Sequence, residues 1–289
     1  MTESDQPDPR LNAYRPDLAD RRLAGCVEAE RFVEGEDRCV VAASAPIRRA
    51  PRHDAALDTE ALRGETVRVF EETAEGWAWG QLKTDGYVGW LPAAALGELG
   101  PVQTHQVAAL RSFAFPGPDI KLPPVMALSL GARLALVAEK GALAETDAGF
   151  VPMRHLAPLD AREADWVGVA ERFVGTPYLW GGRTSLGLDC SGLIQLALAA
   201  CGIACPRDSD MQAGSAGRLL DHRDPSRLAR GDMLFWAGHV GFYAGGGRLL
   251  HANAHFMATV IEPLAEALER MAGQGLELTC IRRPALAAD

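Results

Sequence analysis

The feature that most constrains the fold is a change of pattern along the chain, from short β-type runs to helical periodicity. Between Cys39 and Leu96, runs rich in β-forming residues alternate with turn signals such as Asp85-Gly86. About five such runs within roughly 60 residues predict a small β-barrel. After Gly100-Pro101 a weaker copy of the same layout follows, so we expect a second small all-β barrel.

The pattern changes again after Ala161. Apolar residues recur at helical spacing up to Val174, and a second apolar helix is expected from Cys190 to Cys201. Strand-like runs then follow at 232–238, 239–245, 248–254 and 278–284, with three consecutive glycines at 245–247 as a hairpin turn. Helices followed by an antiparallel sheet predict an α+β domain.

These shifts divide the 289 residues into four predicted segments: an arm at 1–35, barrels at 36–99 and 100–159, and an α+β domain at 160–289. We expect one short helix in the arm, near Asp20–Phe32. The formal net charge of −9 disfavours nucleic acid or an anionic membrane as the main partner, because phosphate binding needs a basic face. No apolar run approaches the roughly 18–20 residues of a membrane-spanning helix.

The start of the chain and its cysteines bear on the compartment. Met1–Arg10 is acidic and contains proline, without the basic and apolar regions of a secretory signal peptide. The six cysteines are scattered and show no paired zinc-type spacing. We therefore expect a reducing cytoplasm, free thiols, and neither metal nor cofactor; a leader removed from the chain would overturn the location.

Cys190 has the most suggestive position of the six cysteines, because it stands where a loop enters an apolar helix. Backbone N–H groups and the helix dipole at such a position favour the nucleophilic thiolate and can hold an oxyanion. The competing interpretation is a small buried apolar residue, which suits the other five cysteines better.

A cysteine nucleophile needs a base, and the base usually needs an orienting group. His239 and His251 begin two strands that flank the triple-glycine turn, so they should lie on one hairpin. Both occupy alternate positions that can face the same side, and Gly238 and Gly241 leave room for a close approach. A single strand histidine would more often be a core residue, but two of them favour a Cys–His site.

The motifs around these residues resemble those of a known family. They are Gly175-Thr176-Pro177-Tyr178-Leu179-Trp180-Gly181-Gly182, Leu188-Asp189-Cys190-Ser191-Gly192, Pro206-Arg207-Asp208-Ser209, Gly231-Asp232-Met233, Gly238-His239-Val240-Gly241 and Leu250-His251-Ala252. In order and spacing they are similar to the NlpC-type cysteine peptidases, papain-like hydrolases of bacterial cell-wall peptides. The resemblance implies that Cys190 attacks the carbonyl, His239 is base and then acid, and His251 orients His239.

The resemblance also implies substrate contacts. Tyr178 would support the oxyanion or the substrate, and Asp189 and Ser191 would hold the amine and backbone of the substrate. Arg207 and Ser209 would line the cleft, the cation facing a free D-glutamate carboxylate. The alternatives are a packed aromatic for Tyr178, a helix N-cap for Asp189, a first-turn residue for Ser191 and a surface salt bridge for Arg207.

Two SH3-like barrels before an α+β papain-like catalytic domain resemble one subfamily in particular, the γ-D-glutamyl-L-diamino-acid endopeptidases. Their substrates are murein peptides with a free N-terminal L-Ala, and the first barrel supplies an acid and a tyrosine that read the amine. Glu65 and Tyr87 are the candidates, with Glu60 as a second acid. A buried ammonium needs such a carboxylate. The alternative is an exposed barrel carboxylate and an edge aromatic.

The function expected from this resemblance is recycling of cell-wall peptides in the cytoplasm. The alternatives are a secreted hydrolase of intact wall, a non-catalytic wall-peptide binding module, and an acyltransferase of permuted papain-like fold. The chain order of cysteine before both histidines disfavours the last. The choice of diaminopimelate or lysine at the leaving side and the oligomeric state stay open.

Overall fold

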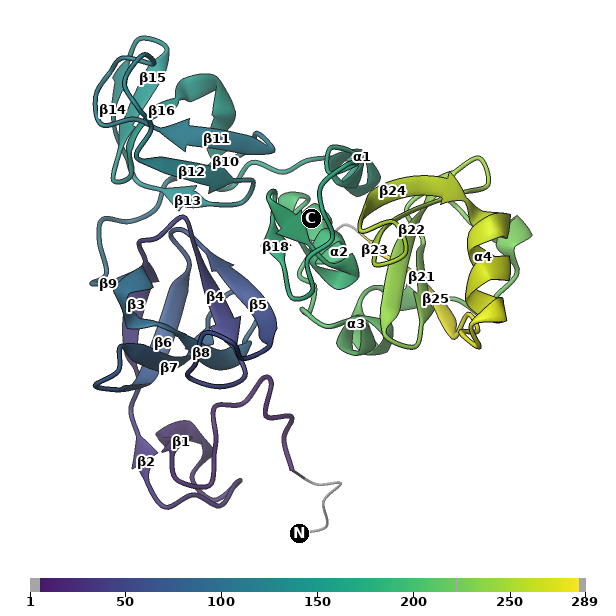
Figure 1. The fold of residues 1–289 in the computed structure, drawn as a ribbon, viewed down its shortest axis with the longest axis horizontal. Helices are drawn as coiled ribbons and strands as arrows, with labels where there is room; N and C mark the ends of the chain where they lie inside the picture. Colours follow the sequence, from purple (N-terminus) through teal and green to yellow (C-terminus); the bar gives the residue numbers. More distant parts are fainter. Residues whose placement is uncertain (1–5, 222, 286–289) are drawn as a thin grey trace. The chain divides into compact units, whose positions relative to one another are not determined.

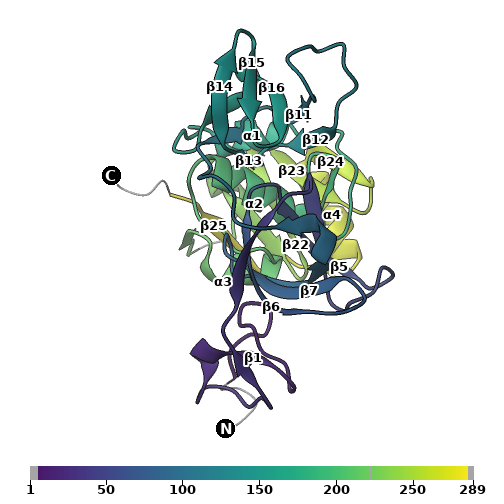
Figure 2. The same ribbon diagram turned by 90° about the vertical axis from the view of Figure 1, so that its left-hand side faces the viewer.

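The structure, a computed structural model, describes residues 6–221 and 223–285. The chain divides into two compact units, Met1–Leu159 and Asp160–Asp289, whose elements are drawn in Figure 1 and, turned by 90°, in Figure 2. Residues 1–5 of the expected arm and 286–289 of the expected α+β domain lie outside the described residues. Within the described part of the chain, no helix has the length and apolar character needed to cross a membrane.

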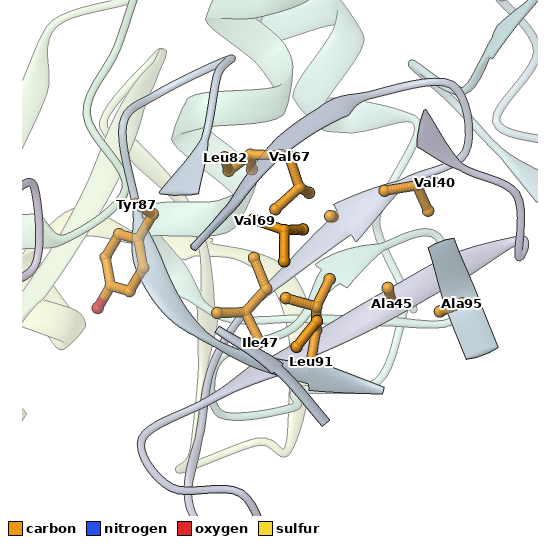
Figure 3. Close-up of a cluster of buried hydrophobic side chains, with 11 residues drawn as sticks. Val40, Ala45, Ile47, Val67, Val69, Leu82, Tyr87, Leu91 and Ala95 are labelled. Atoms are coloured by element: carbon orange, nitrogen blue, oxygen red, sulfur yellow. The ribbon is translucent and has the colours of Figure 1, made fainter. Parts of the chain in front are cut away.

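The first β-module forms an antiparallel sheet of seven strands in the order β5-β4-β8-β7-β6-β3-β9. Its strands are β3 (Glu36–Val40), β4 (Ser44–Arg48), β5 (Leu57–Leu62), β6 (Thr66–Glu72), β7 (Trp77–Leu82), β8 (Val88–Pro92) and β9 (Leu96–Gly97). Alternate residues point inward, so that Val67, Val69, Ile47 and Leu91 share one apolar core (Figure 3). The first predicted β-domain is therefore present at these residues, as a single sheet folded around its own apolar core.

The N-terminal arm packs on the other, tryptophan-bearing face of this module. Ala13 and Leu18 contact a cluster built from Trp77, Trp79 and Trp90. The expected helix near Asp20–Phe32 is wrong: the segment holds β1 (Ala19–Asp20), a 3-10 turn (Arg21–Leu23) and β2 (Phe32–Val33). Parallel pairing of Ala19 with Phe32 closes this segment into a loop, which a continuous helix would prevent.

Residues 105–158 form a second β-module made of three small sheets. The strands are β10 (His105–Val107), β11 (Arg111–Ala114), β12 (Met126–Ser129), β13 (Arg133–Leu134), β14 (Leu136–Lys140), β15 (Leu143–Thr146), β16 (Gly149–Pro152) and β17 (Leu156–Pro158). A smaller apolar core, including Val107, Leu128 and Val151, holds them together. The SH3-like character of this second module stays a prediction.

The helices of the second unit are α1 (Trp166–Glu171), α2 (Cys190–Ala200), α3 (Ser209–Ser215) and α4 (Leu264–Gly273). The prediction of a helix beginning at Cys190 is confirmed. Nine of its residues are buried, which leaves it no solvent-facing polar stripe over most of its length. The helix expected up to Val174 is shorter than its apolar spacing suggested and ends at Glu171.

The sheet of this unit has six strands in the order β20-β25-β21-β22-β23-β24. They are β20 (Arg218–Leu219), β21 (Met233–Trp236), β22 (His239–Gly245), β23 (Arg248–Asn253), β24 (Ala258–Pro263) and β25 (Cys280–Arg283), and a small hairpin pairs β18 (Arg183–Thr184) with β19 (Gly187–Leu188). Helix α4 packs its apolar face on Leu234, Leu249 and Ile281. Figure 1 shows α2 on one side of this sheet and α4 on the other.

Candidate active site

The thiol of Cys190 lies at the first position of α2. Asp189 caps this helix, with its Oδ1 accepting the Gly192 N–H at 2.7 Å. Cys190 is buried, and burial together with the Asp189 carboxylate raises the pKa of its thiol to about 12. The backbone N–H groups of Val240 and Ser191 point toward the sulfur and oppose this rise. The Cys190 thiol is therefore neutral, with two backbone N–H groups directed toward it.

The side chain of Arg207 is buried behind α2, with 1% of its surface exposed. Its guanidinium donates to both oxygens of Asp189, at 2.9 and 2.8 Å, to Ser191 Oγ at 2.8 Å and to the Gly182 carbonyl at 3.2 Å. This corrects both sequence interpretations of Arg207: it is neither a cation lining an open cleft nor a surface salt bridge. The Arg207 guanidinium therefore holds Asp189 and Ser191, the residues on either side of Cys190.

The β22–β23 hairpin brings the two predicted histidines together. His239 begins β22, and His251 lies on β23 opposite Gly241. A Cβ at Gly241 would stand 3.0 Å from that of His251 and 2.9 Å from Leu249 Cδ1, so only glycine leaves the histidine its present place. The predicted close approach is confirmed: His239 Nε2 lies 2.8 Å from His251 Nδ1.

Three further residues complete this chain of contacts, and the sequence analysis did not find them. His251 Nε2 lies 2.7 Å from Glu262 Oε1 and 3.0 Å from Asn253 Nδ2, and Arg270 donates to both oxygens of Glu262. Burial lowers the pKa of His239 to about 3 and also lowers that of His251. The one local signal for Glu262 was a carboxylate closing an otherwise apolar strand.

Tyr178 lies in an extended segment that bridges to Leu188 just before the nucleophile. Its pKa is raised by burial and by the nearby Cys190 and Asp189, which places the phenol in the electrostatic field of the nucleophile. Ser191 is buried and meets Arg207, as described above, while Ser209 is half-buried at the start of α3. Their predicted contacts with substrate stay predictions.

Glu65 and Tyr87 belong to the first unit, and both are buried there. Glu65 Oε2 accepts the Leu62 N–H at 2.7 Å, which fixes the carboxylate in the turn between β5 and β6. Tyr87 lies at the margin of the core, with its hydroxyl directed away from it (Figure 3). Glu60, the second acid considered, lies on β5 beside Ser44. The predicted amine-reading role of these residues stays a prediction.

The Cys190 thiol meets the backbone N–H of Val240, the residue that follows His239, and the His239 imidazole is held by His251 and Glu262. A helix-start thiol and a supported imidazole are the side-chain set of a papain-like nucleophilic hydrolase. Among the described residues, no group of three or more His, Cys, Asp or Glu side chains is arranged to hold a metal ion. Residues 175–268 match the NlpC/P60 family, and residues 47–96 match the bacterial dipeptidyl-peptidase SH3 domain. The chain thus carries an NlpC/P60 cysteine-peptidase domain preceded by a bacterial SH3 domain.

Three known proteins illustrate the similarity. The γ-D-glutamyl-L-lysine dipeptidyl-peptidase of Bacillus subtilis is 29% identical over 255 residues, 80% of this chain and 82% of its own length. The peptidoglycan endopeptidase RipB of Mycobacterium tuberculosis is 33% identical over 111 residues, 32% of this chain and 44% of its own. The crystal structure of an NlpC/P60 family protein from Bacillus cereus, 21% identical, superposes with a TM-score of 0.72 over 86% of this chain and 99% of its own.

Proposed function

We propose that this protein hydrolyses the γ-D-glutamyl–diamino-acid bond of cell-wall peptides that carry a free N-terminal L-Ala. The observation that carries the proposal is the joining of a Cys190–His239–His251 site to an SH3 domain of the dipeptidyl-peptidase type. A relative named γ-D-glutamyl-L-lysine dipeptidyl-peptidase matches across both parts. The coarser statement, a hydrolase of peptidoglycan peptides, rests on the peptidase domain alone.

The residues of the site suggest the following steps of acyl transfer. His239 takes the Cys190 proton as sulfur attacks the peptide carbonyl, because both groups are neutral in the resting site. The Ser191 N–H at the start of α2 and the neighbouring Tyr178 would stabilise the developing oxyanion, a role supported by their proximity to Cys190. His239 then returns its proton to the leaving amine. Water, deprotonated by the same imidazole, releases the peptide acid from the sulfur.

Selectivity for a free amine would come from Glu65 and Tyr87. Glu65 is a buried carboxylate held by a backbone N–H, so its position is fixed before any substrate arrives. An ammonium group gains a charge-assisted partner there, while an acetylated alanine offers no charge and adds bulk. The proposal therefore predicts discrimination at the alanine amine, not at the bond that is cut.

The test uses purified protein with L-Ala-γ-D-Glu-diaminopimelate and with the same tripeptide acetylated on alanine, the products being identified by mass spectrometry. Cleavage of only the free-amine peptide is expected, and Cys190→Ala should abolish it. Cys201→Ala is the matched control, because Cys201 is a buried thiol at the end of the same helix. Equal cleavage of both peptides would remove the amine-reading role of Glu65 and Tyr87.

The similarity to RipB favours a second candidate, the hydrolysis of polymeric peptidoglycan, but it covers only 32% of this chain. Release of soluble peptides from insoluble sacculi, at a rate comparable to that on the tripeptide, would favour this candidate. A cytoplasmic location belongs to the first proposal, and cell fractionation with an antibody to the protein tests it. Cleavage of neither substrate by folded protein would move the assignment to a binding role.

We also propose that the second β-module is a structural repeat of the first and braces it. In both, a glycine N–H is donated to a strand carbonyl, Gly64 to Val40 and Gly131 to Val107, at 2.9 Å each. In both, a proline ends a strand and a 3-10 turn follows, Ala93–Ala95 and Met153–His155. This repeated plan supports a second SH3-like barrel.

The brace acts on the turn that carries Glu65. The Arg133 N–H donates to the Arg63 carbonyl at 2.8 Å, and the buried Arg63 side chain pairs with Asp147 of the second module. A Cβ at Gly64 would lie 2.4 Å from the Arg133 carbonyl oxygen, so the two modules meet without space to spare. Asp147→Ala should therefore slow cleavage of the free-amine peptide, while the acetylated peptide stays uncleaved as in the unmodified protein.

A further inference from the structure

We propose that Glu262, clamped by Arg270, is a positioning residue that fixes the tautomers of His251 and His239 so that His239 Nδ1 remains the base for Cys190. This inference deepens the proposed function and rests on the roles of Cys190 and His239 in it. It assigns a role to Glu262 and Arg270, which lie outside all the sequence motifs of the site.

The side chains of His239, His251 and Glu262 form a continuous row across three neighbouring strands. Alternation places His239 on β22, His251 on β23 and Glu262 on β24 on the same face as Leu249. His251 is fully buried, and Glu262 has 7% of its side chain exposed. Helix α4 covers this face and sends Arg270 to both carboxylate oxygens, at 2.7 and 2.5 Å. The row is therefore ended by a bidentate ion pair.

The direction of each hydrogen bond follows from the end of the row. The Arg270 fork and the His251 contact hold the pKa of Glu262 near 2, against the effect of its burial, so the carboxylate can only accept. His251 Nε2 therefore carries the proton at the 2.7 Å contact, and its Nδ1 is an acceptor. His239 must then donate from Nε2, at 2.8 Å, which leaves its Nδ1 without a proton.

Asn253 is the competing partner at His251. Its Oδ1 accepts the Phe256 N–H at 2.9 Å, so its amide nitrogen faces His251 Nε2 at 3.0 Å. If that amide prevailed, His251 would carry its proton on Nδ1 and both tautomers would reverse, leaving the base of His239 on the wrong nitrogen. The Glu262 carboxylate is both closer to His251 Nε2 and negatively charged, so it forms the stronger hydrogen bond. It therefore favours the tautomer in which His251 carries its proton on Nε2.

The charged groups around the row act in opposite directions. Glu262 raises the pKa of His239 and His251, while Arg270 lowers that of both, and His255 also lowers that of His251. Glu266, on the solvent side of α4, acts on Arg270. Removing Glu262 or Arg270 should consequently shift the pH dependence of the site in opposite senses, a result that a loss of packing alone would not produce.

The experiment measures the rate of Cys190 alkylation by iodoacetamide between pH 2 and 9, a range that includes the acid limb set by His239, by peptide mass spectrometry in the full chain. This readout needs no assumption about the peptide substrate. The exposed Cys26 serves as an internal reference for the reagent. In Glu262→Gln, the amide can present either atom to His251, so we expect a plateau lower by about 10- to 100-fold. The acid limb should move to lower pH.

Arg270→Gln should instead move the acid limb to higher pH, because the cation that depresses both imidazole pKa values is gone. Glu269→Gln, an identical change on an exposed acid next to Arg270, should leave the profile unchanged. Circular dichroism checks that each variant is folded, and Glu262→Asp should recover part of the plateau. Shifts of the same sign in Glu262→Gln and Arg270→Gln, or unchanged profiles in both, would overturn the inference. An unreactive Cys190 in the unmodified protein would instead overturn the proposed function.

Discussion

Two carboxylate–arginine pairs stand behind the active site, and they differ in what they touch. Asp189–Arg207 lies behind the nucleophile, with side chains 11% and 1% exposed, and it binds backbone groups and a hydroxyl. Glu262–Arg270 lies behind the histidines, and its carboxylate also contacts an imidazole. The first pair holds geometry and acts on the Cys190 proton only through its electrostatic field, whereas the second makes a hydrogen bond to an imidazole that exchanges protons.

Among the substitutions that test this comparison, truncation of Arg207 is expected to cause the largest loss of stability. Arg207→Met leaves the Asp189 carboxylate buried and unpaired, which costs about 3–5 kcal/mol. Arg207→Lys should recover only part of this loss, since one ammonium cannot replace a fork that meets four acceptors. Urea unfolding followed by circular dichroism measures both. Equal stability of Arg207→Met and the unmodified protein would show that the pair is dispensable.

The second effect is a stability difference that depends on pH, at Glu262. Its folded pKa of about 2 lies below the ordinary value of 4.5, so its ionisation stabilises the fold above pH 4.5 and loses this effect as the pH falls toward 2. Glu262→Gln should therefore be less stable by about 2–3 kcal/mol at neutral pH, with the gap narrowing in acid. Unfolding curves from pH 7 to pH 3 measure the gap. A constant gap contradicts this assignment.

The third effect concerns the space between the histidines. Gly241→Ala places a methyl group against His251 and Leu249, so we expect a loss of about 1–2 kcal/mol from overpacking and a larger fall in activity. Gly273→Ala is the matched control, because nothing lies within 4 Å of its added Cβ. Full activity in Gly241→Ala would contradict this prediction, because it would show that β22 can shift away from His251 and Leu249 without disturbing the site.

The smallest expected stability effect is at Arg270. The Arg270 side chain is 21% exposed, so its truncation opens the Glu262 carboxylate to water, and His251 still donates to that carboxylate. Arg270→Met should therefore cost only about 1 kcal/mol. The same truncation at Arg207 is expected to cost several times more. Thermal unfolding of the two methionine variants side by side tests this ranking, and a reversed order would show that the roles of the two pairs are exchanged.

Local sequence patterns predicted the parts of the site that depend on neighbours in the chain. The apolar run after Cys190 predicted its helix, and the three glycines at 245–247 predicted the hairpin that joins His239 to His251. Glu262 reaches the site through the register of β23 with β24, which no local pattern encodes. Arg207 was misjudged because the burial of a charge depends on residues far away in sequence. The prediction of a helix in the arm failed for a similar reason, since the segment is shaped by the pairing of Ala19 with Phe32, thirteen residues apart.

The burial of Cys190 has a consequence for oxidative damage. Peroxide attacks the thiolate, and a buried thiol with a pKa near 12 holds very little thiolate at neutral pH. In the resting protein Cys190 should therefore be oxidised more slowly than the exposed Cys26, because it reacts only when His239 takes its proton, as in the alkylation experiment. A substrate that draws the Cys190 proton onto His239 would end that protection for the duration of each turnover.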